Sequence, residues 1–282
     1  MGRVLRTTFD QLYDGQRTGR YRWDQLYKTE KTHCGTLVEI NLQREFDFED
    51  GQALDYEIAG IDVDCKYSQD WGGWMIPPEA LNRLCLVMSG TDNATPTFSA
   101  GLVRITPDRL GAPNRDSKAK LNAAGRTAVV WLFRDVPLSA NVLLQLDRSV
   151  VDKILGLSSG QKRINQLFRS AAGRIVGRGA VATVAQQDDY MKRVRANGGA
   201  RTALRVEGIL ILGQYKSHAA IAFALGLPVP GPGDSISVRV VRAARRGSGV
   251  AEISGRFWRI ASPSDSIVKA PELPKIRSSK SA

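Results

Sequence analysis

The chain has 282 residues, of which 43% are hydrophobic and 24% are charged. This usage is typical of folded globular proteins and excludes wholesale disorder, and the length suits about two domains. Lys and Arg number 40 against 28 Asp and Glu, a formal net charge of +12 that favours a polyanionic partner.

Other function classes are excluded by what the sequence lacks. Three cysteines without a CxxC pair do not predict a disulfide framework or a zinc site. The first residues contain no apolar signal-peptide core, and no apolar run is long enough to cross a bilayer. We therefore expect a soluble, reduced, cytoplasmic protein with no membrane partner.

The positive charge is concentrated in the second half of the chain. Residues 1–150 contain 18 Lys and Arg against 20 Asp and Glu, whereas residues 151–282 contain 22 against 8. This asymmetry predicts two functional parts, unless the basic half serves solubility alone. We expect domains at 1–150 and 158–261, followed by a flexible tail at 262–282.

The first thirty residues interleave arginines with aromatic side chains. Such a segment can bind nucleic acid or pack on its own domain as an arm, and the sequence leaves both possibilities open. The residues are Arg3, Arg6, Arg17, Arg20 and Arg22 with Tyr13, Tyr21, Trp23 and Tyr27.

Helical and strand patterns then alternate up to about residue 150. Residues 32–48 fit a helix better than a strand, because Val38, Leu42 and Phe46 recur at helical spacing. The pattern further predicts a short helix at 116–124 and strands at 54–58, 61–68, 84–88, 97–105 and a buried one at 127–133. These elements indicate an α/β (α+β) domain with a mixed central sheet.

The sequence pattern of the second half predicts a helix, a turn, a second helix and then strands. An amphipathic helix is predicted from residue 160 to 172 and another from Asp188 to Gly198, with strands at 203–212 and 235–241. On a strongly basic segment this order is typical of a helix-turn-helix or winged-helix DNA-binding domain. A basic helical domain that does not touch DNA is the alternative.

The predicted hairpin at residues 54–66 contains the candidate catalytic residues. Asp62, Asp64 and Lys66 are expected on one face of the predicted strand, and a tight turn would bring Asp55 beside them. Converging carboxylates favour a hard divalent cation such as Mg²⁺, to which the carbonyl oxygen of Cys65 could also bind. A metal-activated water could then attack a phosphodiester while Lys66 stabilises the developing charge.

This order of residues is that of the PD-(D/E)xK nucleases. Leu54, however, stands where that pattern has proline. Taken alone the motif is short, and a strand with exposed Asp and Lys side chains is often only a solvated surface. A helix-turn-helix regulator without catalysis and a nicking repair nuclease remain alternatives.

A longer resemblance favours the nuclease. The stretch 27–39 (YKTEKTHCGTLVE), followed by Asp55 and then Asp64-Cys65-Lys66, resembles the NaeI family of type II restriction endonucleases. The spacing also agrees, because Glu39 lies 16 residues before Asp55 and Asp55 nine before Asp64. Residues 160–169 and 198–208 resemble the family too.

The resemblance implies an N-terminal endonuclease domain and a C-terminal domain with a helix-turn-helix like that of catabolite activator protein. It implies a homodimer that uses Mg²⁺, cuts double-stranded DNA to leave 5′-phosphates and binds a second DNA copy as effector. Glu39, Asp55, Asp64 and Lys66 would form the active site. The family's ligase-like patch falls on residues 12–15, where Leu12 cannot serve as the lysine nucleophile, so we expect no nucleotide cofactor.

DNA contacts are predicted in the basic half. The cations there would contact phosphates, and two glutamines near the start of the expected recognition helix would read adenine edges. The predicted contact residues are Lys162, Arg163, Arg169, Arg178, Gln186, Gln187, Lys192, Arg193 and Arg195.

Overall fold

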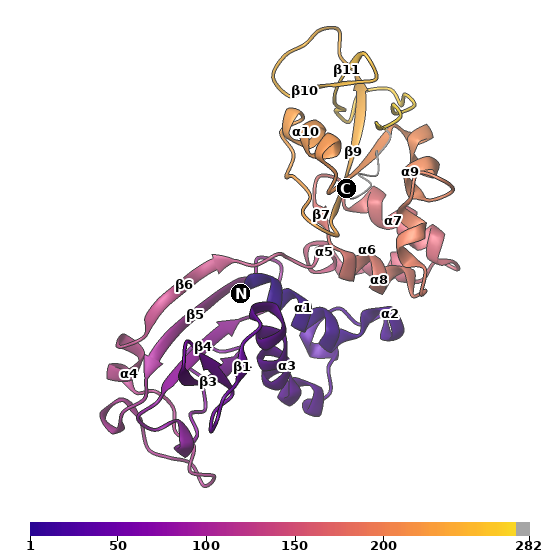
Figure 1. Cartoon of the computed structure of the whole chain (residues 1–282). Coiled ribbons are helices and arrows are strands. Elements are labelled where there is room, and N and C mark those ends of the chain that lie inside the picture. The colour runs from indigo at the N-terminus through magenta and orange to yellow at the C-terminus, as the bar shows by residue number, and fades with distance from the viewer. Residues whose placement is uncertain (275–282) are drawn as a thin grey trace. The chain divides into compact units, whose positions relative to one another are not determined.

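A computed structural model describes residues 1–274. The chain forms two compact units (Figure 1). The N-terminal unit contains residues 1–13 and 22–140, and the C-terminal unit contains residues 14–21 and the chain from Asn141 onward. The division at 140 precedes the predicted boundary at 150, and the assignment of residues 14–21 to the second unit was not predicted. Among the described residues, no helix is both long and apolar enough to span a membrane.

The N-terminal unit is a mixed α/β structure. Its regular elements are α1 (Gly2–Tyr13), α3 (Lys28–Phe46), β1 (Glu49–Asp50), β2 (Tyr56–Ile58), β3 (Ile61–Ser68), β4 (Leu84–Gly90), β5 (Thr97–Arg104), α4 (Ala123–Thr127) and β6 (Val130–Pro137), with 3-10 turns at Trp23–Gln25, Pro78–Ala80 and Pro107–Arg109.

The six strands form one sheet in the order β1 to β6. Only the β3–β4 pair is parallel, and the others are antiparallel, so the sheet is mixed as expected. The turn between β2 and β3 consists of Ala59 and Gly60, both at positive φ. Two consecutive residues in that region form the type I′ turn that favours a tight hairpin.

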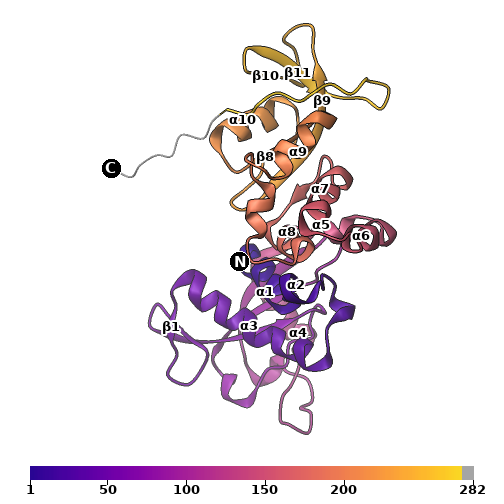
Figure 2. The same ribbon diagram turned by 90° about the vertical axis from the view of Figure 1, so that its right-hand side faces the viewer.

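Helices α1 and α3 cover one face of the sheet (Figures 1 and 2). The helix prediction for 32–48 is confirmed, because Cys34, Val38 and Leu42 recur every four residues and are fully buried. Asn41 donates one hydrogen bond to Thr8 and one to Gln11 of α1 and thereby links the two helices. The opposite face packs on Trp74 and on irregular segments within residues 105–129.

Two predictions for this unit were wrong. Residues 116–122 are not helical, because Ala119 and Leu121 alternate with exposed lysines and form bridges to Ile76 and Leu110; the helix begins only at Ala123. The strand predicted as buried at 127–133 is instead β6, which begins at Val130 and is largely exposed. It is exposed because it lies at the edge of the sheet.

The C-terminal unit contains short helices and a small antiparallel sheet. Its elements are α2 (Gly15–Thr18), α5 (Val142–Gln145), α6 (Arg148–Leu155), α7 (Gly160–Ser170), β7 (Ile175–Val176), α8 (Arg178–Ala185), α9 (Ala200–Ala203), β8 (Ile209–Gly213), α10 (Lys216–Ala224), β9 (Ser235–Arg242), β10 (Val250–Ile253) and β11 (Arg256–Ile260), with 3-10 turns at Tyr190–Val194 and Leu204–Glu207.

The predicted helix α7 is confirmed, but the next helix is misplaced. The second helix of this region is α8, which ends at Gln186 in a left-handed conformation. Residues 188–198 contain only the 3-10 turn at Tyr190–Val194, and the strand predicted from 203 begins at Ile209, after a helical segment. Helices α6 and α10 were not predicted.

Residues 14–21 pack on α8. Gln16 donates a hydrogen bond to Asp188 at 2.9 Å. A Cβ atom on Gly15 would lie 2.0 Å from the Thr183 hydroxyl, so only glycine allows this close approach. Residues 14–21 of the N-terminal arm therefore belong structurally to the C-terminal unit, whereas the arm from Arg22 onward belongs to the N-terminal unit.

The expectation of a flexible tail from residue 262 was wrong for its first part. Arg259 binds Asp265 through two hydrogen bonds, and Ala270 is buried in the core of the C-terminal unit. The rest of the predicted tail, residues 275–282, lies outside the described residues.

The hairpin turn provides a test of this fold. Ala59 at φ 53 is strained, whereas asparagine tolerates the left-handed region and favours type I′ turns. We expect Ala59→Asn to raise the free energy of unfolding by about 0.5–1 kcal/mol in urea titrations. Ala59→Val, a β-branched control, should lower it, and equal stabilities for the two variants would contradict the assigned turn.

Candidate active site

The site forms where the short strand β2 begins beside the longer strand β3. Tyr56 is the first residue of β2 and pairs with Val63 of β3. Beyond this pair the amide of Cys65 has no strand partner on that side, and it donates instead to the carboxylate of Asp55, the residue just before β2, at 2.7 Å. The late start of β2 therefore leaves the main chain of β3 open to Asp55.

Asp62 anchors the segment that carries Asp55. Its two carboxylate oxygens accept hydrogen bonds from the amides of Gln52 and Ala53, at 2.8 and 3.2 Å. Although Asp62 shares a strand with Asp64, its carboxylate is used to hold this loop. The approach of Asp55 to β3 is thus built by local hydrogen bonds.

Lys66 lies at the centre of the site. Its ammonium nitrogen donates to Asp64 Oδ1 at 2.8 Å, to the Cys65 carbonyl at 2.6 Å and to Asp55 Oδ2 at 3.3 Å. Glu39 Oε1 lies 4.0 Å from the same nitrogen. The structure thus brings together all four residues that the sequence singled out.

Glu39 reaches the site from helix α3. The buried Tyr56 hydroxyl donates a hydrogen bond to the main-chain carbonyl of Glu39 at 2.8 Å and fixes α3 against the end of β2. Sequence reasoning missed Tyr56 because its partner lies in a different element. Its place directly after Asp55 was the only signal.

The electrostatics favour a charged lysine among partly desolvated carboxylates. Burial and the nearby charge of Asp55 raise the pKa of Glu39. Burial also raises the pKa of Asp64, against the effect of the hydrogen bond from Lys66. For Lys66, burial works against the charge, but the hydrogen bond to Asp64 and the other carboxylates outweigh it and raise its pKa. The ammonium therefore remains charged at neutral pH.

The oxygens of the site suit a hard cation. Two carboxylates and one main-chain carbonyl converge on a single point of positive charge, the Lys66 ammonium. Across residues 1–274, no three His, Cys, Asp or Glu side chains are arranged to hold a metal ion together. The available ligands are thus two carboxylates with a carbonyl, a set that fits Mg²⁺, which keeps most of its waters.

The predicted DNA contacts of the basic half differ in their availability. Arg163 donates to the carbonyls of Leu157, Val184 and Ala185 at 2.7–3.1 Å, so its guanidinium is used inside the unit. The Oε1 atom of Gln187 is buried and has no hydrogen-bond partner within the described part of the chain.

Two more of these arginines are paired. Arg169 forms two hydrogen bonds of 2.8 Å with Glu207, and Arg193 pairs with Asp189 at 3.2 Å. The predicted contact residues with exposed side chains and no such ion pair are Lys162, Arg178, Gln186, Lys192 and Arg195.

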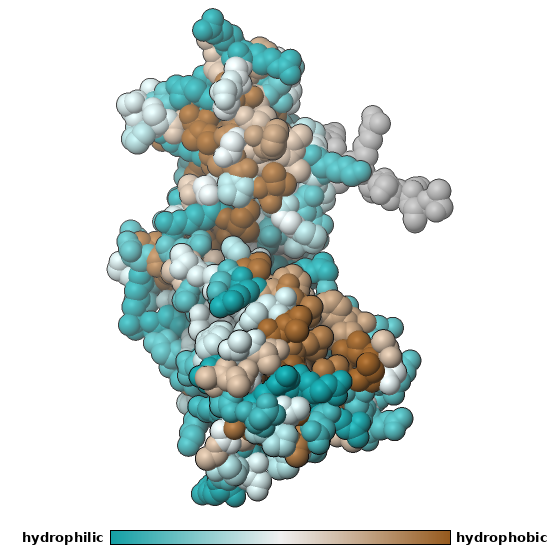
Figure 3. Space-filling model, turned by 90° about the vertical axis from the view of Figure 1, so that its left-hand side faces the viewer, coloured by the Kyte–Doolittle hydropathy of each residue, from teal (hydrophilic) through white to brown (hydrophobic). Residues whose placement is uncertain are grey.

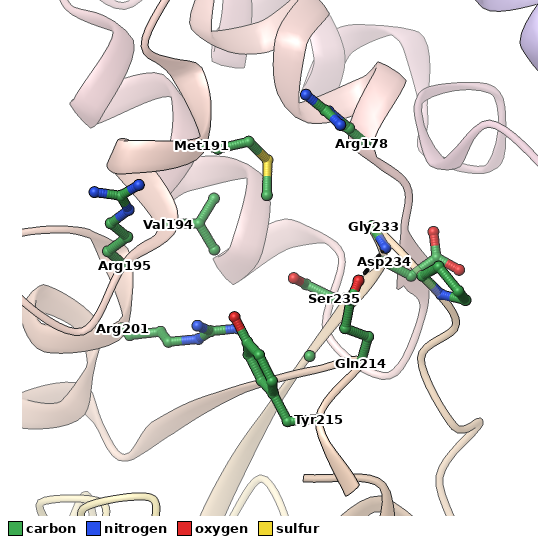
Figure 4. Close-up of a pocket in the computed structure, with 12 residues that line it drawn as sticks. Arg178, Met191, Val194, Arg195, Arg201, Gln214, Tyr215, Gly233, Asp234 and Ser235 are labelled. Atoms are coloured by element: carbon green, nitrogen blue, oxygen red, sulfur yellow. Dashed lines mark hydrogen bonds between the residues drawn. The ribbon is translucent and has the colours of Figure 1, made fainter. Parts of the chain in front are cut away.

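A cleft of about 570 Å³ in the C-terminal unit gathers three arginines (Figure 4). Arg178 and Arg195 were predicted as DNA contacts, and Arg201 was missed because no helix was expected there. Arg201 donates to the Ile211 carbonyl at 3.0 Å, and burial lowers its pKa. Among the residues lining the cleft, Asp234 is the one carboxylate, and burial raises its pKa.

Comparison with known proteins covers both units. The family model described as restriction endonuclease NaeI matches residues 1–269. The type II restriction enzyme NaeI of Lentzea aerocolonigenes is 52% identical over 280 residues, which cover 96% of this chain and 88% of that enzyme. Type II restriction endonucleases generally use a divalent metal ion. With this match over nearly the whole length, the chain belongs to the NaeI family of type II restriction endonucleases, which cleave double-stranded DNA at specific sequences.

Proposed function

We propose that the N-terminal unit is a PD-(D/E)xK-type nuclease domain that uses Mg²⁺ and leaves 5′-phosphate ends. The observation that carries this proposal is the meeting of Asp55, Asp64 and Lys66 within 3.3 Å. The missing proline at position 54 does not weaken it, because hydrogen bonds to Asp62 hold the segment before Asp55.

The residues of the site would have distinct tasks. Asp55, Asp64 and the Cys65 carbonyl would hold the ion, and Glu39 would bind water beside it. When bound, Mg²⁺ supplies a Lewis acid that makes water nucleophilic near neutral pH. Lys66, charged at that pH, stabilises the negative charge that develops on the phosphoryl oxygens. Tyr56 keeps Glu39 in place through its hydrogen bond to the helix.

The C-terminal unit is proposed to be a helix-turn-helix domain of winged-helix type that binds a second DNA copy as effector. Helices α7 and α8 would form the motif, since they pack together in one core and are joined by residues 171–177, which include the two-residue strand β7. Strand β9 pairs with both β7 and β8, and this small antiparallel sheet supports the winged-helix assignment. The exposed cations named above, with Arg201 of the cleft, would contact DNA phosphates.

We propose further that the enzyme is a homodimer, because cutting both strands of a duplex at one site calls for two active sites. Strand β6 is a free sheet edge on which Val130, Leu132 and Phe133 are 68%, 51% and 39% exposed. Figure 3 shows hydrophobic side chains gathered on the side of the N-terminal unit where β6 runs. An apolar edge strand of this kind favours pairing with a second copy.

The catalytic assignment is tested with Asp64→Asn. Loss of one carboxylate charge should lower Mg²⁺-dependent cleavage of plasmid and phage DNA by at least about 10²–10³-fold, while DNA affinity changes little. Asp70→Asn, at an exposed carboxylate outside the site, is the matched control. Wild-type protein and this control should yield discrete linear fragments that EDTA abolishes.

Other outcomes of this digestion would contradict the assignment. Cleavage by Asp64→Asn within tenfold of wild type would remove Asp64 from the site. Open circles alone would indicate a nicking repair nuclease, and no cleavage by the wild type would indicate a non-catalytic regulator.

The DNA interface of the C-terminal unit is tested by the salt dependence of binding. Replacing Arg178 and Arg195 by alanine should reduce the slope of log affinity against log salt by about two, one for each lost phosphate contact. The control replaces Arg148 and Lys153, two exposed cations of α6, and should leave the slope unchanged. Equal slopes for both double variants would place the interface elsewhere.

The dimer is tested by sedimentation equilibrium. Wild-type protein should have twice the 30.8 kDa mass of one chain. The Leu132→Lys substitution puts a charge on the proposed interface and should lower the measured mass toward that of the monomer. Phe223→Lys changes an apolar side chain of α10 that is 80% exposed, and it should remain dimeric. A dimeric Leu132→Lys variant would exclude β6 as the interface.

A further inference from the structure

The two carboxylate oxygens of Asp64 have different surroundings. Oδ1 accepts the hydrogen bond from Lys66 at 2.8 Å and faces the site. Oδ2 faces the opposite way, toward the thiol of Cys85 on the neighbouring strand β4, at 3.6 Å. Both residues are buried, with exposed fractions of 3% and 0%. The thiol therefore touches a proposed metal ligand from the core side.

The pairing of β3 with β4 creates this contact. Asp64 and Cys85 are direct partners in the parallel ladder, so their side chains point to the same face of the sheet. On that face Cys85 is surrounded by apolar side chains, including Trp74, Val87 and Val103. An apolar environment disfavours a thiolate, so the sulfur keeps its proton and donates a hydrogen bond to Oδ2 of Asp64.

We propose that Cys85 is a positioning residue. Its thiol engages Oδ2 of Asp64 in a hydrogen bond, so that only Oδ1 is available to bind the metal ion. This inference rests on the proposed role of Asp64 as a ligand. A carboxylate held in this way binds an ion through one oxygen only. The thiol thus decides the binding mode of Asp64 without touching substrate or metal.

Single-oxygen binding has a consequence for ion choice. Mg²⁺ and Mn²⁺ accept six oxygens in octahedral geometry and take few carboxylates, whereas Ca²⁺ accepts six to eight and often binds both oxygens of one carboxylate. Because Cys85 keeps Oδ2 from binding the ion, it lowers the affinity of the site for Ca²⁺ relative to its affinity for the smaller ions. It would then be a specificity-determining residue for the metal.

Replacement of Cys85 separates this role from simple packing. Cys85→Ala and Cys85→Val both remove the donor, and valine also refills the space in the core. Cys85→Ser keeps a hydroxyl donor at the same position. If Cys85 only packs, loss of the donor changes stability and leaves the preference between ions as it was.

The experiment is calorimetric titration of the full chain with MnCl₂ and with CaCl₂, each metal alone and without DNA. We expect the ratio of the Ca²⁺ to the Mn²⁺ dissociation constant to fall about five- to tenfold in Cys85→Ala and Cys85→Val. Cys85→Ser should stay within about twofold of the wild-type ratio. Circular dichroism and the melting temperature establish that each variant is folded.

The outcomes distinguish this inference from the proposed function. An unchanged ratio in a folded alanine or valine variant would overturn the role of Cys85, and so would a serine variant that shifts as far as alanine. Wild-type protein that binds neither ion would remove the metal site itself, and this inference with it.

Discussion

The ammonium of Lys66 lies within 3.3 Å of oxygens from Asp55, Asp64 and the Cys65 main chain, and the N-terminal unit is organised around this contact. Bringing carboxylates together is unfavourable unless a cation lies between them. In the free chain the lysine provides that charge, and a divalent ion can take over the same oxygens. The electrostatic cost of bringing the carboxylates together is thus offset by Lys66, the same group that the proposed chemistry needs.

The surrounding fold holds these groups by hydrogen bonds that begin outside the cluster. Asp62 anchors the loop before Asp55, Tyr56 fixes helix α3 and so Glu39, and Cys85 meets the inner oxygen of Asp64. Residues of the strands β2, β3 and β4 therefore control the position of three acidic side chains. Such supporting contacts decide whether a site is accurate enough to work.

The functions proposed for the two units follow the charge distribution of the chain. The acidic residues of the first half include Glu39, Asp55 and Asp64 of the candidate site, whereas the cleft of the second half is lined by three arginines and one carboxylate. Residues 14–21 complicate this simple order, because the chain leaves the N-terminal unit after Tyr13 and returns at Arg22. The units are consequently joined by three chain crossings.

Local pattern and spacing in the sequence determined helices α3 and α7, the β2–β3 hairpin and the candidate site residues Asp55, Asp64 and Lys66, because each depends on neighbours along the chain. Glu39 was indicated only by the family resemblance. Only the tertiary structure decided that β6 is an exposed edge, that α8 rather than residues 188–198 is the second helix, and that Arg163 is used internally. It also decided the partnership of Asp64 with Cys85, 21 residues away on a parallel strand. Strand order and long-range register depend on how whole surfaces pack, and a single sequence does not encode those pairings in any local pattern.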